Sequence, residues 1–363
     1  MDQTLEKLSE CVKGITLDVI PEEVLHQTKL RLLDYLGCVI GAFNQESAKR
    51  IRNVAIGFGT SFGGATLLGT SRRCSADMAC FVNGMMGRYL DFNDQYSGRT
   101  TGHPSDVIPA VLAAVEISGK SGADTITGIL AGYEVFGRLC DAVTLRPKWD
   151  HVTLGAIAAA GAASNAMGLS RDKTKQAISI ATVSNVALDE TRRGNLSHWK
   201  AGAFPNASRQ GLFAALLAKE GITGPDLPFH GGQGFWNSVA FPEELGALDG
   251  DPDRYKLMDT AIKAHSACYL DLSAVDAILA LREDVRIEDV EKIIVYVYRY
   301  SIELTADGPM KWRPSTRETA DHSLPYILAT ALREGYIGPE HYKESLYKDQ
   351  DVLDLMDKVE VRE

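Results

Sequence analysis

Residues 152–170 read VTLGAIAAAGAASNAMGLS and carry no charged side chain. A helix that is apolar all round is usually buried in the core of a large protein. Alanine and glycine recur through the segment, and such small side chains allow neighbouring helices to pack closely. The segment therefore predicts a buried helix and a tightly packed, mostly helical core.

Helical periodicity extends over most of the first 240 residues. Pro21, Glu22 and Glu23 are typical of a helix start, because proline suits the first turn and acidic side chains suit the positive end of the helix dipole. Glycines separate the later apolar segments. The further helices that we predict cover residues 75–89, 107–118, 124–143, 151–167, 173–186 and 207–220.

Residues 290–300 read VEKIIVYVYRY and differ in character from the preceding chain. β-branched and aromatic residues with partial alternation indicate a strand. Apolar residues at helical spacing predict flanking helices at 272–283 and 325–334. This mixture is typical of an α+β domain.

The length of the chain predicts two domains, and a turn motif indicates where the boundary between them lies. A chain of 363 residues usually forms two domains, and Gly250, Asp251 and Pro252 make a plausible turn between them. We predict a mainly α protein, with a large helical domain over residues 1–260 and a smaller α+β domain over residues 261–363.

The overall composition argues against several classes of partner and cofactor. The net charge is −10 and the pI is near 5.4, whereas binding to nucleic acid or to an anionic membrane requires a basic face. No apolar run reaches membrane-spanning length, and the first residues lack the pattern of a signal peptide. The six cysteines form no CxxC pair, so we expect reduced thiols, no metal site and a cytoplasmic protein.

A polar cluster interrupts the helical pattern. Residues 90–96 read LDFNDQY and residues 102–106 read GHPSD, so Asp91, Asp94 and His103 are close in sequence. Carboxylates beside an imidazole orient it and raise its basicity, as acid–base catalysis requires. The alternative is a histidine that only caps the following helix. The two aspartates favour a catalytic site.

Other segments carry further candidate groups. His151 opens a helix whose dipole disfavours the charged imidazole, so it can act as a neutral base or simply as a cap. Arg192, Arg193 and Lys200 form a positive patch, which either binds substrate carboxylates or is a solvated loop. Residues 311–326 are rich in ionisable side chains, and they form either a site or a surface network of ion pairs.

Two motifs resemble parts of a serine hydrolase. Residues 59–63 read GTSFG, like a nucleophile elbow around Ser61, and residues 230–234 read HGGQG, like an oxyanion loop. The elbow requires a helix after the serine, but Gly63 and Gly64 disfavour one. In hydrolases the oxyanion loop also precedes the elbow, whereas here it follows. We therefore prefer a glycine-rich turn.

Taken together, the motifs resemble those of the MmgE/PrpD family, whose members include 2-methylcitrate dehydratase, cis-aconitate decarboxylase and iminodisuccinate epimerase. The resemblance covers essentially the whole chain. The most specific motifs occur in the family's order at residues 90–94, 102–106, 199–200 with 206–209, 221–225 and 316–323.

This resemblance implies a large helical domain, a smaller α+β lid domain and a homodimer. It also implies catalysis on a small polycarboxylate without a metal or an organic cofactor. A loop after Lys263 would close over the site. The catalytic residues carried over by position are Asp91, Asp94, His103, His151 and Lys200, and our candidates for substrate binding are Arg192, Arg193 and Cys268.

The interval between Asp91 and His103 resembles that of the 2-methylcitrate dehydratases, which serve propionate catabolism. We therefore predict a hydro-lyase that eliminates water from a hydroxy-tricarboxylate such as 2-methylcitrate. The alternatives are decarboxylation of cis-aconitate, epimerisation of iminodisuccinate and a catalytically inactive family member.

Two features depart from the family pattern. Ser266 stands in place of a proline, and Cys268 stands in place of a Glu or His. The sequence also stops where relatives continue, so we expect the C-terminal helical return to be missing.

Overall fold

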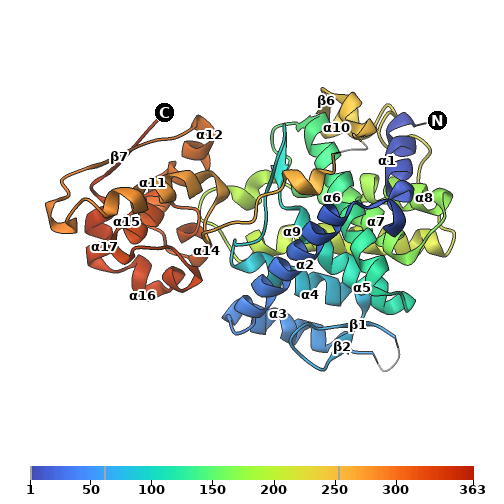
Figure 1. The fold of residues 1–363 in the computed structure, drawn as a ribbon, viewed down its shortest axis with the longest axis horizontal. Helices are drawn as coiled ribbons and strands as arrows, with labels where there is room; N and C mark the ends of the chain where they lie inside the picture. Colours follow the sequence, from blue (N-terminus) through green and yellow to red (C-terminus); the bar gives the residue numbers. More distant parts are fainter. Residues whose placement is uncertain (1, 61–62, 252–253) are drawn as a thin grey trace. The chain divides into compact units, whose positions relative to one another are not determined.

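The computed structural model describes residues 2–60, 63–251 and 254–363. The chain forms two compact units (Figure 1). Unit 1 contains residues 1–89, 93–189 and 201–262, and unit 2 contains residues 90–92, 190–200 and 263–363. Two short segments from earlier in the sequence thus belong to unit 2. Ser61 of the hydrolase-like motif and Pro252 of the predicted turn lie outside the described residues.

Helix α7 (Val152–Met167) is the buried helix that the uncharged segment predicts. All of its residues except Asn165 are buried. It packs against α5 (Ile108–Ser118), α6 (Gly122–Ala142) and α8 (Arg171–Ser184). A Cβ atom on Gly155 of α7 would lie only 2.4 Å from Cε1 of Phe204, so glycine permits this close packing.

Unit 1 also contains short strands of two or three residues. Within the described part of unit 1, two-stranded antiparallel sheets pair β1 with β2, β3 with β4 and β5 with β6. Their bounds are β1 Ala65–Thr66, β2 Arg73–Cys74, β3 Tyr96–Ser97, β4 Thr101–Gly102, β5 Val143–Leu145 and β6 Ala240–Pro242. The other helices in this part of the chain are α1 Gln3–Gly14, α2 Glu22–Ala42, α3 Glu46–Ile56, α4 Ala76–Tyr89, α9 Trp199–Lys219 and α10 Phe235–Ser238.

The predicted helix at 207–220 was wrong at its start. Helix α9 begins at Trp199 and includes Pro205 in its interior. Proline removes one intrahelical hydrogen bond and usually ends a helix. Here the proline ring packs at the surface of α4, where a Cβ atom on Gly84 would lie 2.9 Å from Cβ of Pro205. Tertiary packing has overridden the local signal.

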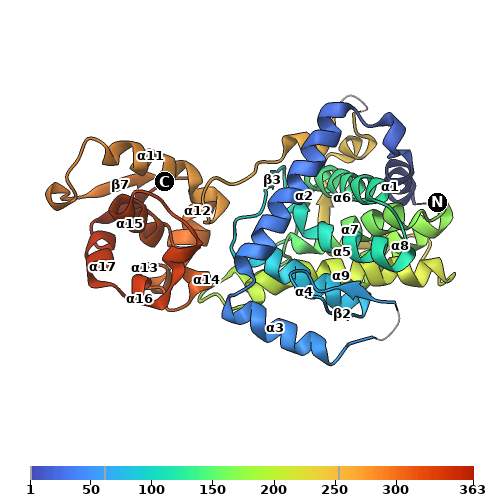
Figure 2. The same ribbon diagram turned by 60° about the horizontal axis from the view of Figure 1, so that its bottom comes forward.

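Unit 2 has its own hydrophobic core, formed around α15 (Leu324–Glu334). This helix packs against α11 (Leu272–Arg282) and α17 (Gln350–Met356) (Figure 2). Short helices complete the unit at α12 Arg299–Ser301, α13 Pro309–Trp312, α14 Arg317–Ala320 and α16 Glu344–Tyr347, together with a π-helical turn at Ile302–Ala306.

The predicted strand at 290–300 is confirmed only in its middle. Strand β7 (Ile293–Tyr296) pairs in parallel with β8 (Val359–Arg362), with Ile293 opposite Val359. The pairing ends where β8 ends, and the chain enters α12 at Arg299. Within the described residues, no helix is long and apolar enough to cross a membrane.

Candidate active site

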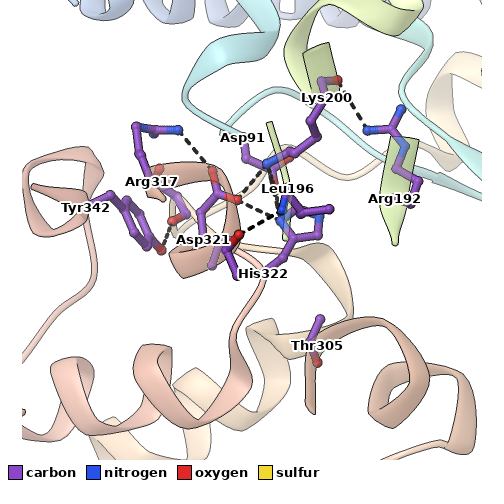
Figure 3. Close-up of polar contacts among 12 residues, drawn as sticks. Asp91, Arg192, Leu196, Lys200, Thr305, Arg317, Asp321, His322 and Tyr342 are labelled. Atoms are coloured by element: carbon purple, nitrogen blue, oxygen red, sulfur yellow. Dashed lines mark hydrogen bonds and ion pairs between the residues drawn. The ribbon is translucent and has the colours of Figure 1, made fainter. Parts of the chain in front are cut away.

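A buried ionic network in unit 2 centres on the ammonium group of Lys200 (Figure 3). Its Nζ lies 2.6 Å from Oδ1 of Asp321, 3.6 Å from Oδ2 of Asp91 and 3.2 Å from Nδ1 of His322. The side chains of Lys200 and Asp91 are 1% exposed, and that of Asp321 is fully buried. Charges this far from water require partners, and this network supplies them.

A second lysine completes the network. Nζ of Lys263 donates to Oδ1 of Asp91 at 3.2 Å, to the backbone oxygen of Asp91 at 2.9 Å and to that of Ala267 at 2.9 Å. The Asp91 carboxylate therefore has one ammonium group at each oxygen. We call Asp91, Lys200, Lys263, Asp321 and His322 the lysine cluster. Lys263 was not among the site residues predicted from the sequence. Its position between the apolar residues Ile262 and Ala264 was the available indication that it is buried.

Local structure explains how these side chains are presented. Asp321 and His322 form the link between two capped helices, since Thr316 caps α14 and Ser323 caps α15 through their side-chain oxygens. Asp91 has a φ of 51°, in the left-handed region that non-glycine residues rarely adopt. Strain of this kind persists where surrounding contacts fix it, and it is frequent at functional sites.

In the lysine cluster, Asp321 is an ionised carboxylate and His322 is a neutral imidazole at pH 7. Burial raises the pKa of Asp321, but Lys200, His322 and Arg317 together outweigh it and lower that pKa to about 2. Arg317 contributes a hydrogen bond of 3.0 Å to Oδ2 of Asp321. Burial, reinforced by Lys200, lowers the pKa of His322 to about 4. His322 is therefore a neutral imidazole at pH 7, with Nδ1 also 2.7 Å from Oδ1 of Asp321.

The lysine cluster contains side chains of types that bind metals. Atoms of Asp91, Asp321 and His322 lie within 4.8 Å of one another. However, Nζ of Lys200 approaches all three, so its ammonium group supplies the positive charge that these oxygens and this nitrogen require. The donor set therefore fits a lysine-centred site for anions better than a metal site.

A further polar group of unit 2 lies near Cys268. The Cys268 backbone nitrogen donates to the Asp321 backbone oxygen at 3.0 Å, and burial raises the thiol pKa well above its ordinary value. Asp271 accepts hydrogen bonds from Ser301 at 3.2 Å and Thr305 at 3.0 Å, both at Oδ1. Burial raises the pKa of Asp271 to about 7. The predicted site residue Cys268 is thus a buried, protonated thiol.

A separate polar cluster lies in unit 1 around His103. Its Nδ1 is 2.7 Å from the backbone oxygen of Asp94, and its Nε2 is 2.8 Å from Nη2 of Arg88. A carbonyl only accepts and a guanidinium only donates, so Nδ1 carries the proton and Nε2 accepts from Arg88. The ring is thus held as one neutral tautomer. We expected a carboxylate to orient it, but the backbone oxygen of Asp94 does so.

The carboxylate of Asp94 accepts hydrogen bonds from Ser105 and Tyr133. Its Oδ1 accepts from the backbone nitrogen of Ser105 at 3.1 Å, and its Oδ2 accepts from the Tyr133 hydroxyl at 2.7 Å. Burial raises the pKa of Asp94, against the opposing effect of these hydrogen bonds. Asp94 therefore ties the chain that carries His103 to helix α6.

Arg88 was not among the site residues predicted from the sequence. It lies in the last turn of α4, is 2% exposed, and also donates to Oδ1 of Asn93 at 3.1 Å. Its Nε is 3.6 Å from Oδ2 of Asp106. An arginine in an otherwise mostly apolar helix was the available signal.

The second predicted histidine lies beside the first. The ring centroids of His103 and His151 are 5.8 Å apart, in an edge-on arrangement. Nδ1 of His151 is 2.9 Å from Oδ1 of Asp150. We call Arg88, Asp94, His103, Asp150 and His151 the histidine cluster.

The predicted site residues therefore divide between the units. Asp91, Lys200 and Cys268 belong to unit 2, and Asp94, His103 and His151 belong to unit 1. Both arginine candidates belong to unit 2 as well: Arg192 is buried and donates to the backbone oxygen of Lys200 at 3.3 Å, while Arg193 is exposed.

The loop compared with a hydrolase oxyanion loop has a structural explanation. The backbone nitrogens of Phe229 and His230 donate to Oδ2 of Asp2, at 2.9 and 3.1 Å. These two donors are therefore engaged by an internal carboxylate.

Comparison with known proteins identifies related sequences. Residues 6–246 match the model of the MmgE/PrpD N-terminal domain, and residues 265–363 match that of the MmgE/PrpD C-terminal domain. A 2-methylcitrate dehydratase of Salmonella typhimurium is 26% identical over 351 residues, which covers 90% of this chain and 71% of that protein. The mitochondrial 2-methylcitrate dehydratase of Yarrowia lipolytica is 24% identical, with 99% and 72% covered. A cis-aconitate decarboxylase of Mus musculus is 25% identical, with 98% and 75% covered.

Proposed function

Because the chain belongs to the MmgE/PrpD family, we propose that it is a hydro-lyase that eliminates water from a hydroxy-tricarboxylate such as 2-methylcitrate. The relatives named 2-methylcitrate dehydratase support a dehydratase-type enzyme. The proposal for the substrate rests chiefly on the chemistry of the lysine cluster.

The observation that carries the proposal is the Asp91 carboxylate between two buried ammonium groups. Among the charged side chains described in this network, three are cations (Lys200, Lys263 and Arg317) and two are carboxylates (Asp91 and Asp321). Cations in excess within a desolvated region favour an anionic ligand. A polycarboxylate supplies such anions.

The reaction needs this positive charge. A base removes the proton from the carbon next to a carboxylate, and the C–H electron pair forms the new double bond. The C–O bond to the hydroxyl breaks, and that oxygen takes a proton and leaves as water. Preorganised cations stabilise the negative charge that develops on the carboxylate oxygens, and such stabilisation often contributes more to catalysis than any other effect.

We assign roles to the named residues as follows. Lys200, with Arg192 holding its backbone, binds a substrate carboxylate, and Lys263 holds Asp91 in place. His103 and His151 transfer the protons. Of the two, His151 is the better candidate for the base, because Nε2 of His103 already accepts from Arg88. Each proton transfer typically contributes about 10²–10⁴-fold to the rate.

A second candidate is decarboxylation of cis-aconitate. It is favoured by the Mus musculus relative, whose identity to this chain is close to that of the dehydratases. Both reactions act on tricarboxylates, so the lysine cluster suits either. A role in propionate catabolism follows only from the first.

The test is to incubate the purified protein separately with 2-methylcitrate, cis-aconitate and iminodisuccinate and to follow products by NMR. We expect an unsaturated tricarboxylate from 2-methylcitrate. Release of carbon dioxide from cis-aconitate would select the second candidate. No turnover of any of the three would contradict the proposal.

The homodimer that the family resemblance implies stays a prediction. Sedimentation velocity tests it: the chain mass is 39.5 kDa, and a dimer would have twice that mass.

A further inference from the structure

Asp150 is a buried carboxylate directly before α7. Its side chain is fully buried, and its Oδ1 accepts from the backbone nitrogen of Val152 at 3.1 Å. The same Oδ1 lies 2.9 Å from Nδ1 of His151. Its backbone nitrogen donates to the backbone oxygen of Ala187 at 2.8 Å. The carboxylate is therefore anchored independently of the imidazole that it contacts.

This contact determines where the imidazole proton lies. A negatively charged oxygen this close repels the lone pair of an unprotonated Nδ1, so the carboxylate favours the tautomer with the proton on Nδ1. In the neutral ring, the lone pair is then on Nε2. Among the described residues, Nε2 of His151 has no hydrogen-bond partner although it is buried. A lone pair with proton affinity is thus available at a defined atom.

The surroundings of the neighbouring His103 ring can be compared with those of His151. His103 also carries its proton on Nδ1, but its Nε2 accepts from the Arg88 guanidinium at 2.8 Å. A cation at this nitrogen opposes protonation, whereas a carboxylate behind Nδ1 favours it. The two adjacent histidines therefore have opposite electrostatic surroundings, with a cation at Nε2 of His103 and a carboxylate at Nδ1 of His151.

The His151 ring lies beside Phe204 and Gly102. The centroid of the Phe204 ring lies 6.4 Å from that of His151. A Cβ atom on Gly102 would lie 2.9 Å from Cδ2 of His151 and 2.5 Å from Cζ of Phe136. Glycine at position 102 therefore leaves the space that the imidazole occupies.

We propose that Asp150 is a positioning residue, which fixes His151 as the Nδ1–H tautomer and makes its Nε2 the proton acceptor from the substrate carbon. The inference rests on the proposed function for the identity of the substrate. In the step, Nε2 takes the proton, the C–H electron pair forms the double bond, and the Asp150 carboxylate stabilises the resulting imidazolium.

Two variants separate charge from hydrogen bonding. Asp150→Asn can keep an oxygen that accepts from the backbone nitrogen of Val152 and lies beside Nδ1 of His151, but it loses the negative charge. Asp150→Ala loses both. We expect kcat to fall at least tenfold in the first and at least a hundredfold in the second, with KM within about threefold of wild type. Asp150→Glu, which keeps the charge, is expected to recover part of the activity.

A second readout does not depend on turnover. Nitrogen-15 NMR of histidine-labelled protein distinguishes the two neutral tautomers, and His151→Gln assigns the signal. We expect wild type and Asp150→Asn to show the Nδ1–H form, and Asp150→Ala to shift towards Nε2–H.

The outcomes distinguish this inference from the proposed function. An Nε2–H tautomer in wild type, or an unchanged kcat in a folded Asp150→Ala variant, would overturn the role of Asp150. If none of the three proposed substrates reacts, the proposed function fails, while the NMR measurement still decides whether Asp150 fixes the tautomer.

Discussion

The ammonium nitrogen of Lys200 lies 2.6 Å from Oδ1 of Asp321, and both side chains are almost completely buried. The nearer carboxylate also has Arg317 at its other oxygen, at 3.0 Å. Lys200 is thus the centre of a network in which each carboxylate retains another cation if the lysine is removed. Because each carboxylate keeps a second cation, a Lys200 variant should stay folded, and its loss of substrate binding can then be measured.

Replacing Lys200 should cost only moderate stability. In Lys200→Met, Asp321 keeps Arg317 and Asp91 keeps Lys263, so we expect a loss of about 2 kcal/mol, below the 3–5 kcal/mol typical of leaving a buried charge alone. Urea unfolding measures it. The control is Lys348→Met, whose side chain is 58% exposed, and which should change stability by less than about 0.5 kcal/mol. A loss above about 5 kcal/mol would mean that the network is chiefly structural.

His322 predicts a specific dependence of stability on pH. Its folded pKa is about 4, below the ordinary value of 6.5, so the unfolded state binds more protons between these values. Stability should therefore rise from pH 4 to 6.5, by about 3 kcal/mol from this residue. His322→Asn should flatten the rise, measured by urea unfolding at several pH values. His26→Asn, which alters an exposed histidine, should leave the profile unchanged; identical profiles in both variants would refute the prediction.

Asp271 predicts the opposite slope. Its folded pKa is about 7 against 3.8, so the folded state keeps a proton that the unfolded state has lost. Stability should fall as pH rises from about 4 to 7, by about 4 kcal/mol from this residue. Asp271→Asn keeps the oxygen that accepts from Ser301 and Thr305, and should remove this fall.

The control for this variant is Asp284→Asn, an exposed residue after α11. Its stability profile should match that of wild type. If Asp271→Asn shows the same fall as wild type between pH 4 and 7, the buried carboxyl is not the cause.

Two glycine-to-alanine changes test the packing of the core. Gly155→Ala would place a Cβ atom 2.4 Å from the Phe204 ring, and we expect a loss of about 1–3 kcal/mol. Gly37→Ala, in α2, meets nothing within 4 Å and should stabilise by about 0.5–1 kcal/mol. Thermal unfolding compares the two. Adding Phe204→Leu should restore part of the loss, whereas equal effects at both glycines would contradict the packing.

The sequence predicted well those elements whose signal is local. The segment that forms α7 carries no charged side chain, and a helix that is apolar all round is stable only when it is buried. The start of α9 at Trp199 was not predicted, because the packing space beside Gly84 that accommodates Pro205 cannot be seen from local sequence. The strand signal at 290–300 was longer than the strand, because the partner strand β8 sets the length of the pairing.

The candidate site was only partly predictable for a related reason. Asp91, His103, His151 and Lys200 stand in recognisable motifs. Arg88 and Lys263 each stand alone in apolar surroundings, and only the fold shows that they contact His103 and Asp91. Asp150 is next to His151 in sequence, but its role depends on the rotamer that brings its Oδ1 to the imidazole.

Substrate binding at Lys200 is tested most directly by calorimetric titration of 2-methylcitrate into wild type and Lys200→Met at pH 7.5. If the buried ammonium group binds a substrate carboxylate, the variant should bind at least about tenfold more weakly, which corresponds to about 1.4 kcal/mol. Equal affinity of the two proteins, or no binding to wild type, would contradict the binding of a substrate carboxylate by Lys200.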